Sequence, residues 1–178
     1  MKKNTRRKYL IPAVACLVVM AGFVYSYFFA SMAAGNETRY VYIDTDDTVD
    51  SVYTKLTDVS SLNGMEGFKT LVRHSHYADN IRTGRYAIKP GEGAFTVFRH
   101  MKNGLQSPVS LTVPSVRTLD RLAAELSKRL MVDSAAIYEA LSDEAICKKY
   151  GYDTATVAAL FIPNTYDIYW NVSVEKLL

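Results

Sequence analysis

LIPAVACLVVMAGFVYSYFFA, residues 10–30, is the stretch that organises the rest of the chain. Its twenty-one residues include no charged side chain. An α-helix rises about 1.5 Å per residue, so a helix of this length spans about 30 Å, the thickness of the hydrocarbon core of a bilayer. The sequence therefore predicts a transmembrane helix from Leu10 to Ala30, through which the protein contacts the membrane.

The residues on either side predict the orientation of this helix. The basic residues before it are Lys2, Lys3, Arg6, Arg7 and Lys8, with no acid among them. The aromatic residues at its far end are Tyr25, Tyr27, Phe28 and Phe29. Basic flanks stay in the cytoplasm, and aromatic rings favour the membrane interface. We therefore expect residues 1–9 to be a cytoplasmic tail and the chain from about residue 36 onward to lie outside the cytoplasm.

A cleaved signal peptide is the alternative interpretation of this segment. Ser31-Met32-Ala33 resembles a small-x-small cleavage site. The apolar region of a signal peptide has only about 7–15 residues, however, and this one is longer. The length therefore favours an uncleaved anchor.

The charge of the chain argues against a nucleic-acid partner. The formal net charge is +3, from 21 basic and 18 acidic residues, but five of the basic residues precede the apolar stretch. The remaining 16 basic and 18 acidic residues give the rest of the chain a net charge of −2. Nucleic-acid binding depends on clustered positive charge, so its main electrostatic support is missing.

Cysteine and histidine residues predict neither an intrachain disulfide nor a metal site. Cys16 lies in the apolar stretch, which leaves Cys147 as the one cysteine outside it. His74 and His76 are two residues apart, so they share a face only in a strand, and no third ligand is near them in the sequence. We expect no metal and no cofactor.

Strands and helices alternate after a short polar linker at residues 31–39, which indicates an α+β fold. Runs that favour β-structure at residues 40–43, 84–88 and 109–113 are each followed by a turn and by apolar residues at helical spacing. The predicted helices contain Val49–Leu56, Phe95–Met101 and Leu119–Leu130. A strand, a turn and a short helix cannot bury their apolar face alone, so we expect the three copies to pack together.

Capping signals and further helices complete this pattern. Asp46, Asp47 or Thr48 is expected to cap the first of these helices, and Asn103-Gly104 to end the second. Residues 64–73 predict another short helix. After an Asp133 cap, residues 134–151 predict an αα hairpin.

The last part of the chain combines a predicted turn with aromatic side chains. Pro163 favours an extended conformation of Ile162, and the sequence Pro163-Asn164-Thr165 is typical of a turn. The aromatic residues that follow are Tyr166, Tyr169 and Trp170. Aromatic faces beside polar groups can line a carbohydrate groove, and they can equally form a local core.

Taken in order, these features resemble the MltG/YceG-like family of endolytic murein transglycosylases. They are the basic tail, one membrane span, G-R-Y-A-I-K-P-G from Gly84, F-x-x-M-K-N-G from Phe98, and L-F-I-P-N-T-Y from Leu160. The resemblance implies a LysM-like βα region at residues 40–108 and the start of a mixed α/β catalytic domain at residues 109–178. A member of this family would continue well beyond Leu178, so we interpret the chain as a fragment truncated within the catalytic domain.

The resemblance also implies a substrate, partners and a location. The family cleaves the glycan strands of peptidoglycan near the membrane, which produces anhydro-muramyl ends and contributes to cell-wall organisation. The implied location is the bacterial inner membrane, crossed once, with the rest of the chain in the periplasm or its equivalent. Peptidoglycan glycan strands are the implied substrate, and cell-wall synthesis proteins are further implied partners. The candidate substrate-binding residues are Phe161, Asn164, Thr165, Tyr166, Tyr169 and Trp170.

The chain departs from the family pattern at the catalytic position. Phe161, Pro163 and Thr165 match a motif that follows the catalytic Glu of the family. The positions that differ in that region are Ala158 in place of the Glu, Ala159 in place of a Gly and Asn164 in place of an Asp. The positions that differ after the third strand are Ser115 and Val116, where the family usually has an acidic residue and a Gly.

This departure has a chemical consequence. A lytic transglycosylase needs a protonated carboxyl group that donates a proton to the glycosidic oxygen and then takes one from a sugar hydroxyl as the anhydro ring closes. Alanine can do neither, and general acid–base catalysis contributes about 10²–10⁴-fold. The acid comes from the missing C-terminal part, or Asp167 has replaced it, or the protein binds glycan without cutting it. The first explanation is favoured, and the catalytic residue stays unknown.

Three functions therefore remain open at this point. The first is a membrane-anchored peptidoglycan lytic transglycosylase, of which residues 1–178 alone are expected to be inactive. The second is a membrane-anchored glycan-binding or divisome scaffold protein without turnover. The third is an ectodomain that binds only proteins.

Overall fold

The computed structural model describes residues 3–178, with side chains from residue 9 onward. Lys2 of the predicted basic tail lies outside the described residues. The described chain divides into two compact units. The first unit runs to Arg82 and resumes at Tyr86–Leu105, and the second unit contains Thr83–Arg85 and Gln106–Leu178. Both units combine helices with paired strands, which confirms the mixed α and β character expected from the sequence.

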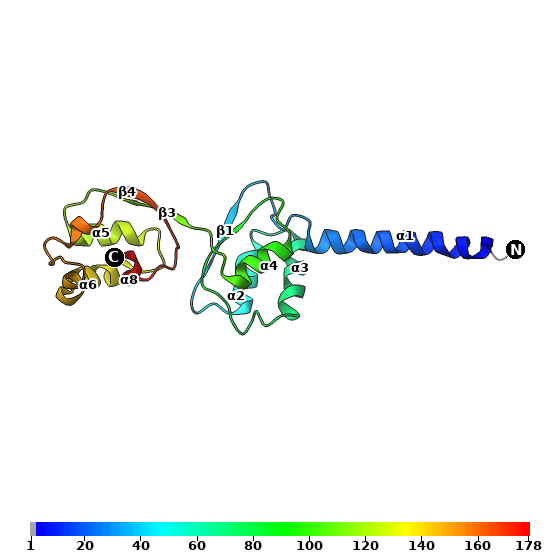
Figure 1. Ribbon diagram of the computed structural model, residues 1–178, viewed down its shortest axis with the longest axis horizontal. Coiled ribbons are helices and arrows are strands. Elements are labelled where there is room, and N and C mark those ends of the chain that lie inside the picture. The colour runs from blue at the N-terminus through cyan, green and yellow to red at the C-terminus, as the bar shows by residue number, and fades with distance from the viewer. Residues whose placement is uncertain (1–2) are drawn as a thin grey trace. The chain divides into compact units, whose positions relative to one another are not determined.

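Helix α1, Lys3–Phe28, contains the predicted membrane-spanning stretch (Figure 1). Its part from Tyr9 to Phe28 is long and apolar enough to cross a membrane, and its side chains are exposed except at Tyr27 and Phe28, which are half-buried. A helix that is apolar on every side and exposes those side chains is typical of a membrane span. The helix ends two residues before the predicted Ala30.

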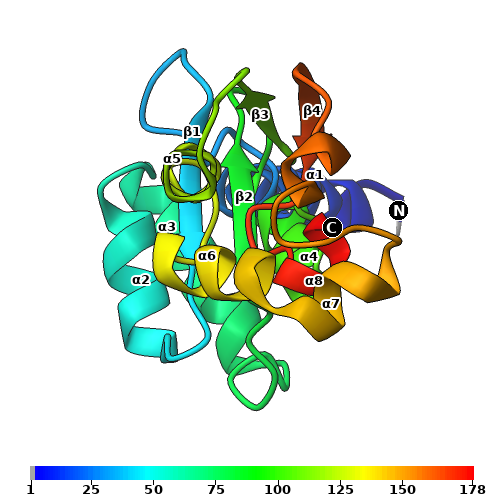
Figure 2. The same ribbon diagram turned by 90° about the vertical axis from the view of Figure 1, so that its left-hand side faces the viewer.

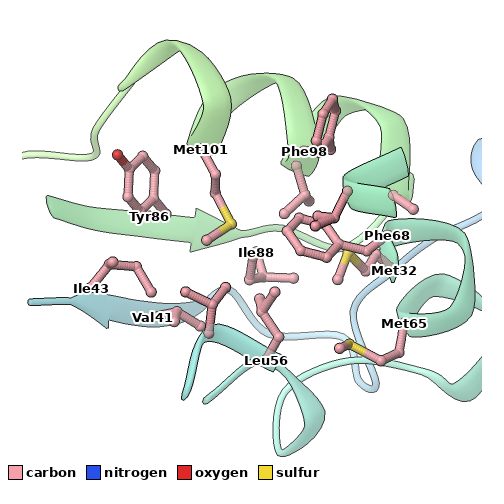
Figure 3. Packing of buried hydrophobic residues seen from close by; sticks show 14 of the residues in the cluster. Met32, Val41, Ile43, Leu56, Met65, Phe68, Tyr86, Ile88, Phe98 and Met101 are labelled. Atoms are coloured by element: carbon pink, nitrogen blue, oxygen red, sulfur yellow. The ribbon is translucent and has the colours of Figure 1, made fainter. Parts of the chain in front are cut away.

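Strands β1, Arg39–Ile43, and β2, Gly84–Ile88, pair with each other in the first unit (Figures 1 and 2). The helices packed around this pair are α2, Val49–Thr57, α3, Leu62–Arg73, and α4, Ala94–Asn103. Figure 3 shows the core of the unit, where side chains from both strands meet side chains from these helices. The labelled core residues are Met32, Val41, Ile43, Leu56, Met65, Phe68, Tyr86, Ile88, Phe98 and Met101.

Local sequence signals begin and end these helices as predicted. Thr48 is the N-cap of α2, since its hydroxyl accepts from the amide of Ser51 and the Ser51 hydroxyl accepts from the amide of Thr48. Asp47 instead accepts a hydrogen bond from the ammonium group of Lys55 at 2.6 Å. Gly104 ends α4 in the left-handed conformation, with φ of 70°.

Residues 31–34, the start of the predicted linker at residues 31–39, pack into the first unit. Met32 is completely buried. Its amide donates to the carbonyl of Glu92 at 2.8 Å, and its carbonyl accepts from the amide of Ser61 at 2.7 Å. Ala33 lies opposite Ser60 in an isolated antiparallel bridge. The chain therefore passes from α1 directly into the core of the first unit.

Strands β3, Val109–Val113, and β4, Asn164–Ile168, form an antiparallel pair in the second unit. The helices of this unit are α5, Leu119–Ser127, α6, Ser134–Ser142, α7, Glu144–Lys149, the 3-10 helix η1, Val157–Leu160, and α8, Val174–Leu177. Asp133 and Asp143 cap α6 and α7, because each carboxylate accepts from a backbone amide of its helix at 2.7 Å. Both caps agree with the predicted αα hairpin.

The prediction that three strand-and-helix copies pack together is wrong for the third copy. Strand β3 pairs with β4, and its buried side chains belong to a separate core in the second unit. The predicted turn at Pro163-Asn164-Thr165 is also wrong, because Asn164 and Thr165 begin β4. Asn164 lies opposite Val113, and Thr165 lies opposite Thr112. This long-range pairing satisfies backbone groups of β3, and Pro163 is tolerated because it precedes the strand.

Candidate substrate-binding site

The register of β3 and β4 gives their ladder one apolar and one polar face. Val109, Leu111 and Val113 are buried, whereas Ser110 and Thr112 are exposed. On β4, the residues opposite the buried positions are Ile168, Tyr166 and Asn164. Side chains alternate between the two faces of a strand, so Tyr166 and Asn164 lie on the apolar face. Thr165 and Asp167 lie on the polar face.

A pocket of about 210 Å³ opens on the apolar face of this ladder. We name it the strand pocket. Its wall is largely aliphatic, with the phenol of Tyr166 and the ring of Phe161 as aromatic parts and Lys176 as its cation. The hydroxyl of Tyr166 donates to the carbonyl of Ile162 at 3.1 Å, which fixes the ring beside the pocket. An apolar wall with few polar groups is typical of small ligand sites.

A second pocket of about 250 Å³ lies next to the segment that follows β3, and we name it the alanine pocket. The residues that line it are Pro114, Ser115, Val116, Leu122, Ala158, Ala159, Phe161 and Pro163. Phe161 lines both pockets. The predicted position of the family's catalytic Glu, Ala158, and the departure at Ser115 therefore lie in one pocket, although they are far apart in the sequence.

A local turn presents Ala158 and Ala159 to this pocket. The carboxylate of Asp153 accepts from the hydroxyl of Thr156 at 2.7 Å and from its amide at 2.8 Å. These hydrogen bonds lower the pKa of Asp153. They hold the chain at the start of η1, whose middle residues are the two alanines.

Carboxylate groups do not line either pocket among the described residues. Asp167, the weak candidate for the acid, is exposed on the polar face of the ladder. Its Oδ1 accepts from the hydroxyl of Ser110 at 2.9 Å. On the same face the hydroxyls of Thr112 and Thr165 lie 3.0 Å apart. Asp167 and Thr165 therefore lie on the opposite face of the strand from Tyr166.

The remaining candidate residues are divided between surface and core. Asn164 is exposed, and its side-chain oxygen accepts from the amide of Thr165 at 2.8 Å. Tyr169 is exposed in the turn after β4. Trp170 is half-buried and packs against the core of the second unit. The structure thus gathers Phe161, Tyr166 and Asn164 on one face and puts Trp170 in a mainly structural position.

Several residues of the strand pocket were not predicted from the sequence. They are Val172, Lys176 and Leu177. The sequence predicted a strand at residues 109–113, but only its pairing with β4 shows which later residues meet its apolar face. Among the described residues, no histidine lines either pocket. His74 contacts the carbonyl of Thr70, and His76 contacts Asp79. The described residues contain no group of three or more His, Cys, Asp or Glu that could hold a metal ion.

Comparison with known proteins identifies a related solved structure and a family. The crystal structure of a yceG-like protein from Listeria monocytogenes matches with 19% sequence identity and a TM-score of 0.43. The match covers 80% of this chain and 52% of that protein, so the chain spans about half the length of this relative. No curated protein matches the chain significantly. The model of the YceG-like family matches residues 41–178, which begin within β1 and include the later strands and helices of both units, and the chain therefore belongs to the YceG-like family.

Proposed function

We propose that this protein is anchored in the inner membrane of a bacterium by α1 and acts on peptidoglycan outside the cytoplasm, as part of an endolytic murein transglycosylase. The observation that carries the proposal is the family match over residues 41–178. The exposed apolar surface of α1 supports the anchor, and the basic residues that precede it support a cytoplasmic N-terminus. In this proposal residues 40–108 are the LysM-like region, and residues 109–178 begin the catalytic domain.

The face that carries Phe161, Tyr166 and Asn164 is the proposed contact with the glycan strand. Sugar rings have apolar faces that stack on aromatic rings, and their hydroxyls need hydrogen-bonding partners. Phe161 and Tyr166 offer the rings, and Asn164 offers an exposed amide on the same side of the strand. Tyr169 is exposed one residue beyond β4 and is a separate proposed contact, since it lines neither pocket.

The proton donor is proposed to lie outside residues 1–178. Neither pocket is lined by a carboxylate among the described residues, and Asp167 lies on the other face of β4. A general acid must come within about 2.6–3.2 Å of the glycosidic oxygen, and Asp167 is not on the side where the proposed glycan contacts lie. The part of the enzyme described in the structure then supplies glycan contacts and not the acid.

A glycan-binding protein without turnover is the second candidate. The alanine pocket favours it, because Ala158 and Ser115 stand where the resemblance implies acidic residues, and both line this pocket. In such a protein, the strand pocket would bind the glycan and no bond would break. Cell-wall synthesis proteins would then be the partners that use the anchored protein as a scaffold.

Incubation of the complete natural protein, purified in detergent, with isolated sacculi separates these functions. Release of anhydro-muropeptides, identified by mass spectrometry, supports the transglycosylase. Sedimentation of the protein with sacculi without such products supports the glycan-binding scaffold. Absence of both overturns the two proposals and favours an ectodomain that binds only proteins. Y166A should weaken sedimentation, and Y138A, which removes an exposed tyrosine from α6, is the matched control.

A further inference from the structure

The end of α1 is fixed against the first unit through contacts that need glycine. A Cβ atom at Gly67 of α3 would overlap the carbonyl oxygen of Tyr27. A Cβ atom at Gly93, which precedes α4, would lie within 2.7 Å of backbone atoms of Phe28 and Phe29. The backbone at the end of α1 therefore touches α3 and the start of α4 without intervening side chains. Figure 1 shows the end of α1 beside α3.

Hydrogen bonds continue this attachment beyond the end of the helix. The hydroxyl of Tyr27 lies 3.2 Å from that of Thr70 on α3. The hydroxyl of Ser31 accepts from the amide of Gly91 at 3.1 Å. Met32 then enters the core, as described above. The segment from Tyr27 to Met32 therefore attaches the end of α1 to the rest of the first unit at several points.

This attachment fixes the level of the first unit relative to a membrane that α1 crosses. The apolar part of α1 from Tyr9 to Phe28 has 20 residues, which corresponds to a helix of about 30 Å. Its end at Phe28 therefore marks the outer limit of the hydrocarbon core. Gly93 and the first turn of α4 lie at this level, because Gly93 touches Phe28 and Phe29.

Exposed aromatic side chains continue from α1 onto α4 at this level. The rings of Phe29 and Phe95 lie 5.9 Å apart, and Tyr25 stacks on Phe29 at 6.1 Å. Phe95, in the first turn of α4, is 42% exposed, and Phe29 is 50% exposed. We name Tyr25, Phe29 and Phe95 the aromatic collar. Aromatic rings are enriched at this depth because their apolar bodies favour the interface over water.

We propose that the aromatic collar is seated in the outer interface of the bilayer, with Phe95 of the first unit in contact with lipid. This inference rests on the membrane anchor of the proposed function and adds a second contact with the membrane, made by the folded unit itself. Arg99 lies one helical turn after Phe95 on the same face of α4 and is exposed. Its charge suits the phosphate groups of the lipid headgroups.

Tryptophan fluorescence in lipid vesicles tests this seating. The complete chain is reconstituted in vesicles of phosphatidylethanolamine and phosphatidylglycerol that contain lipids brominated near the headgroup or near the end of the acyl chains. F95W should lose fluorescence with lipids brominated near the headgroup. Y42W, at an exposed position of β1 in the first unit, is the matched control and should keep the fluorescence of the parent protein, whose one tryptophan is Trp170.

A third variant separates the failure of this inference from the failure of the anchor. L17W lies in the middle of the apolar part of α1 and should be quenched by lipids brominated near the end of the acyl chains. Quenching of L17W without quenching of F95W overturns the seating of the collar and leaves the anchor in place. Absence of quenching in both variants overturns the anchor and the collar together. Protection of F95W from both lipid and aqueous quenchers, with L17W quenched, indicates a protein partner at this surface and likewise overturns the lipid contact.

Discussion

The hydroxyl groups of Tyr27 and Thr70 lie 3.2 Å apart and join the last turn of α1 to α3. Thr70 is three residues after Gly67, so both lie on the same face of α3. The hydroxyl pair and the close approach at Gly67 therefore hold the same helix end. A contact of this kind is sensitive to the addition of a single methyl group.

We expect G67A to destabilise the first unit, although alanine favours helices over glycine by about 0.8–1.0 kcal/mol. The added Cβ would overlap the carbonyl oxygen of Tyr27, and overpacking costs about 1–3 kcal/mol. G22A in α1 is the matched control, because nothing lies within 4 Å of its added Cβ. Chemical denaturation in detergent gives the two stabilities. Equal stability of the two variants would show that α1 does not pack against α3 in this way.

Loss of the hydroxyl should affect the stability of the protein differently at two buried tyrosines of the first unit. The hydroxyl of Tyr86 donates to the carbonyl of Arg82 at 2.9 Å, so Y86F should cost about 0.5–1.5 kcal/mol. The hydroxyl of Tyr77 is buried without a hydrogen-bonding partner among the described residues, so Y77F should be neutral or stabilising. Thermal unfolding of the two variants measures the difference. A larger loss for Y77F would contradict this assignment of partners.

Acid should destabilise the first unit through Asp47. Burial raises the pKa of this carboxyl, but hydrogen bonds from Lys55, Ser51 and the Asp44 amide outweigh it and lower the pKa below the ordinary value of 3.8. A lowered pKa in the folded state means that the stabilisation is complete above the unfolded value and is lost as the pH falls through the folded one. D47N should therefore be less stable at neutral pH and lose less stability on acidification. Denaturation between pH 7 and pH 2 compares the variant with the parent protein. An unchanged pH dependence in D47N would contradict this role.

Asp167 is not expected to be the catalytic acid of the complete enzyme. Its carboxylate lies on the polar face of β4 and accepts a hydrogen bond from the hydroxyl of Ser110. D167N should therefore release anhydro-muropeptides at nearly the rate of the parent protein. Loss of a general acid would instead reduce the rate by about 10²–10⁴-fold. The initial rate of product release from sacculi distinguishes the two cases. S110A, which removes only the partner hydroxyl, controls for local changes in the strand.

Much of the fold could be predicted from local sequence signals, because those signals act within a few residues. The run of β-favouring residues at 40–43 predicted β1, and Asp133 predicted the start of α6. The extended conformation of Asn164 and Thr165 could not be predicted, because the neighbouring Pro163 favours a turn and the pairing partner lies in β3, far away in the sequence. The conformation predicted for this segment from the sequence alone was therefore wrong.

The candidate site was only partly predictable for the same reason. Phe161 and Tyr166 lie together at the strand pocket, as an aromatic groove requires. Asp167 follows Tyr166 directly, yet it lies on the opposite face, since adjacent residues of a strand alternate between faces. This alternation could not be applied to the segment as long as it was interpreted as a turn. The sequence left open whether Trp170 lines a groove or packs in a core. Its packing against the core of the second unit decides between the two positions.

The complete burial of Met32 determines where a recombinant ectodomain should begin. A soluble form that starts at residue 36 would lack this side chain, and loss of a buried methionine side chain typically costs about 2–5 kcal/mol. It would also leave the amide of Ser61 and the carbonyl of Glu92 without the backbone partners that Met32 gives them. Expression boundaries at or before Ser31 keep these groups paired, and low yield from shorter forms would reflect a damaged core rather than an absent lipid environment.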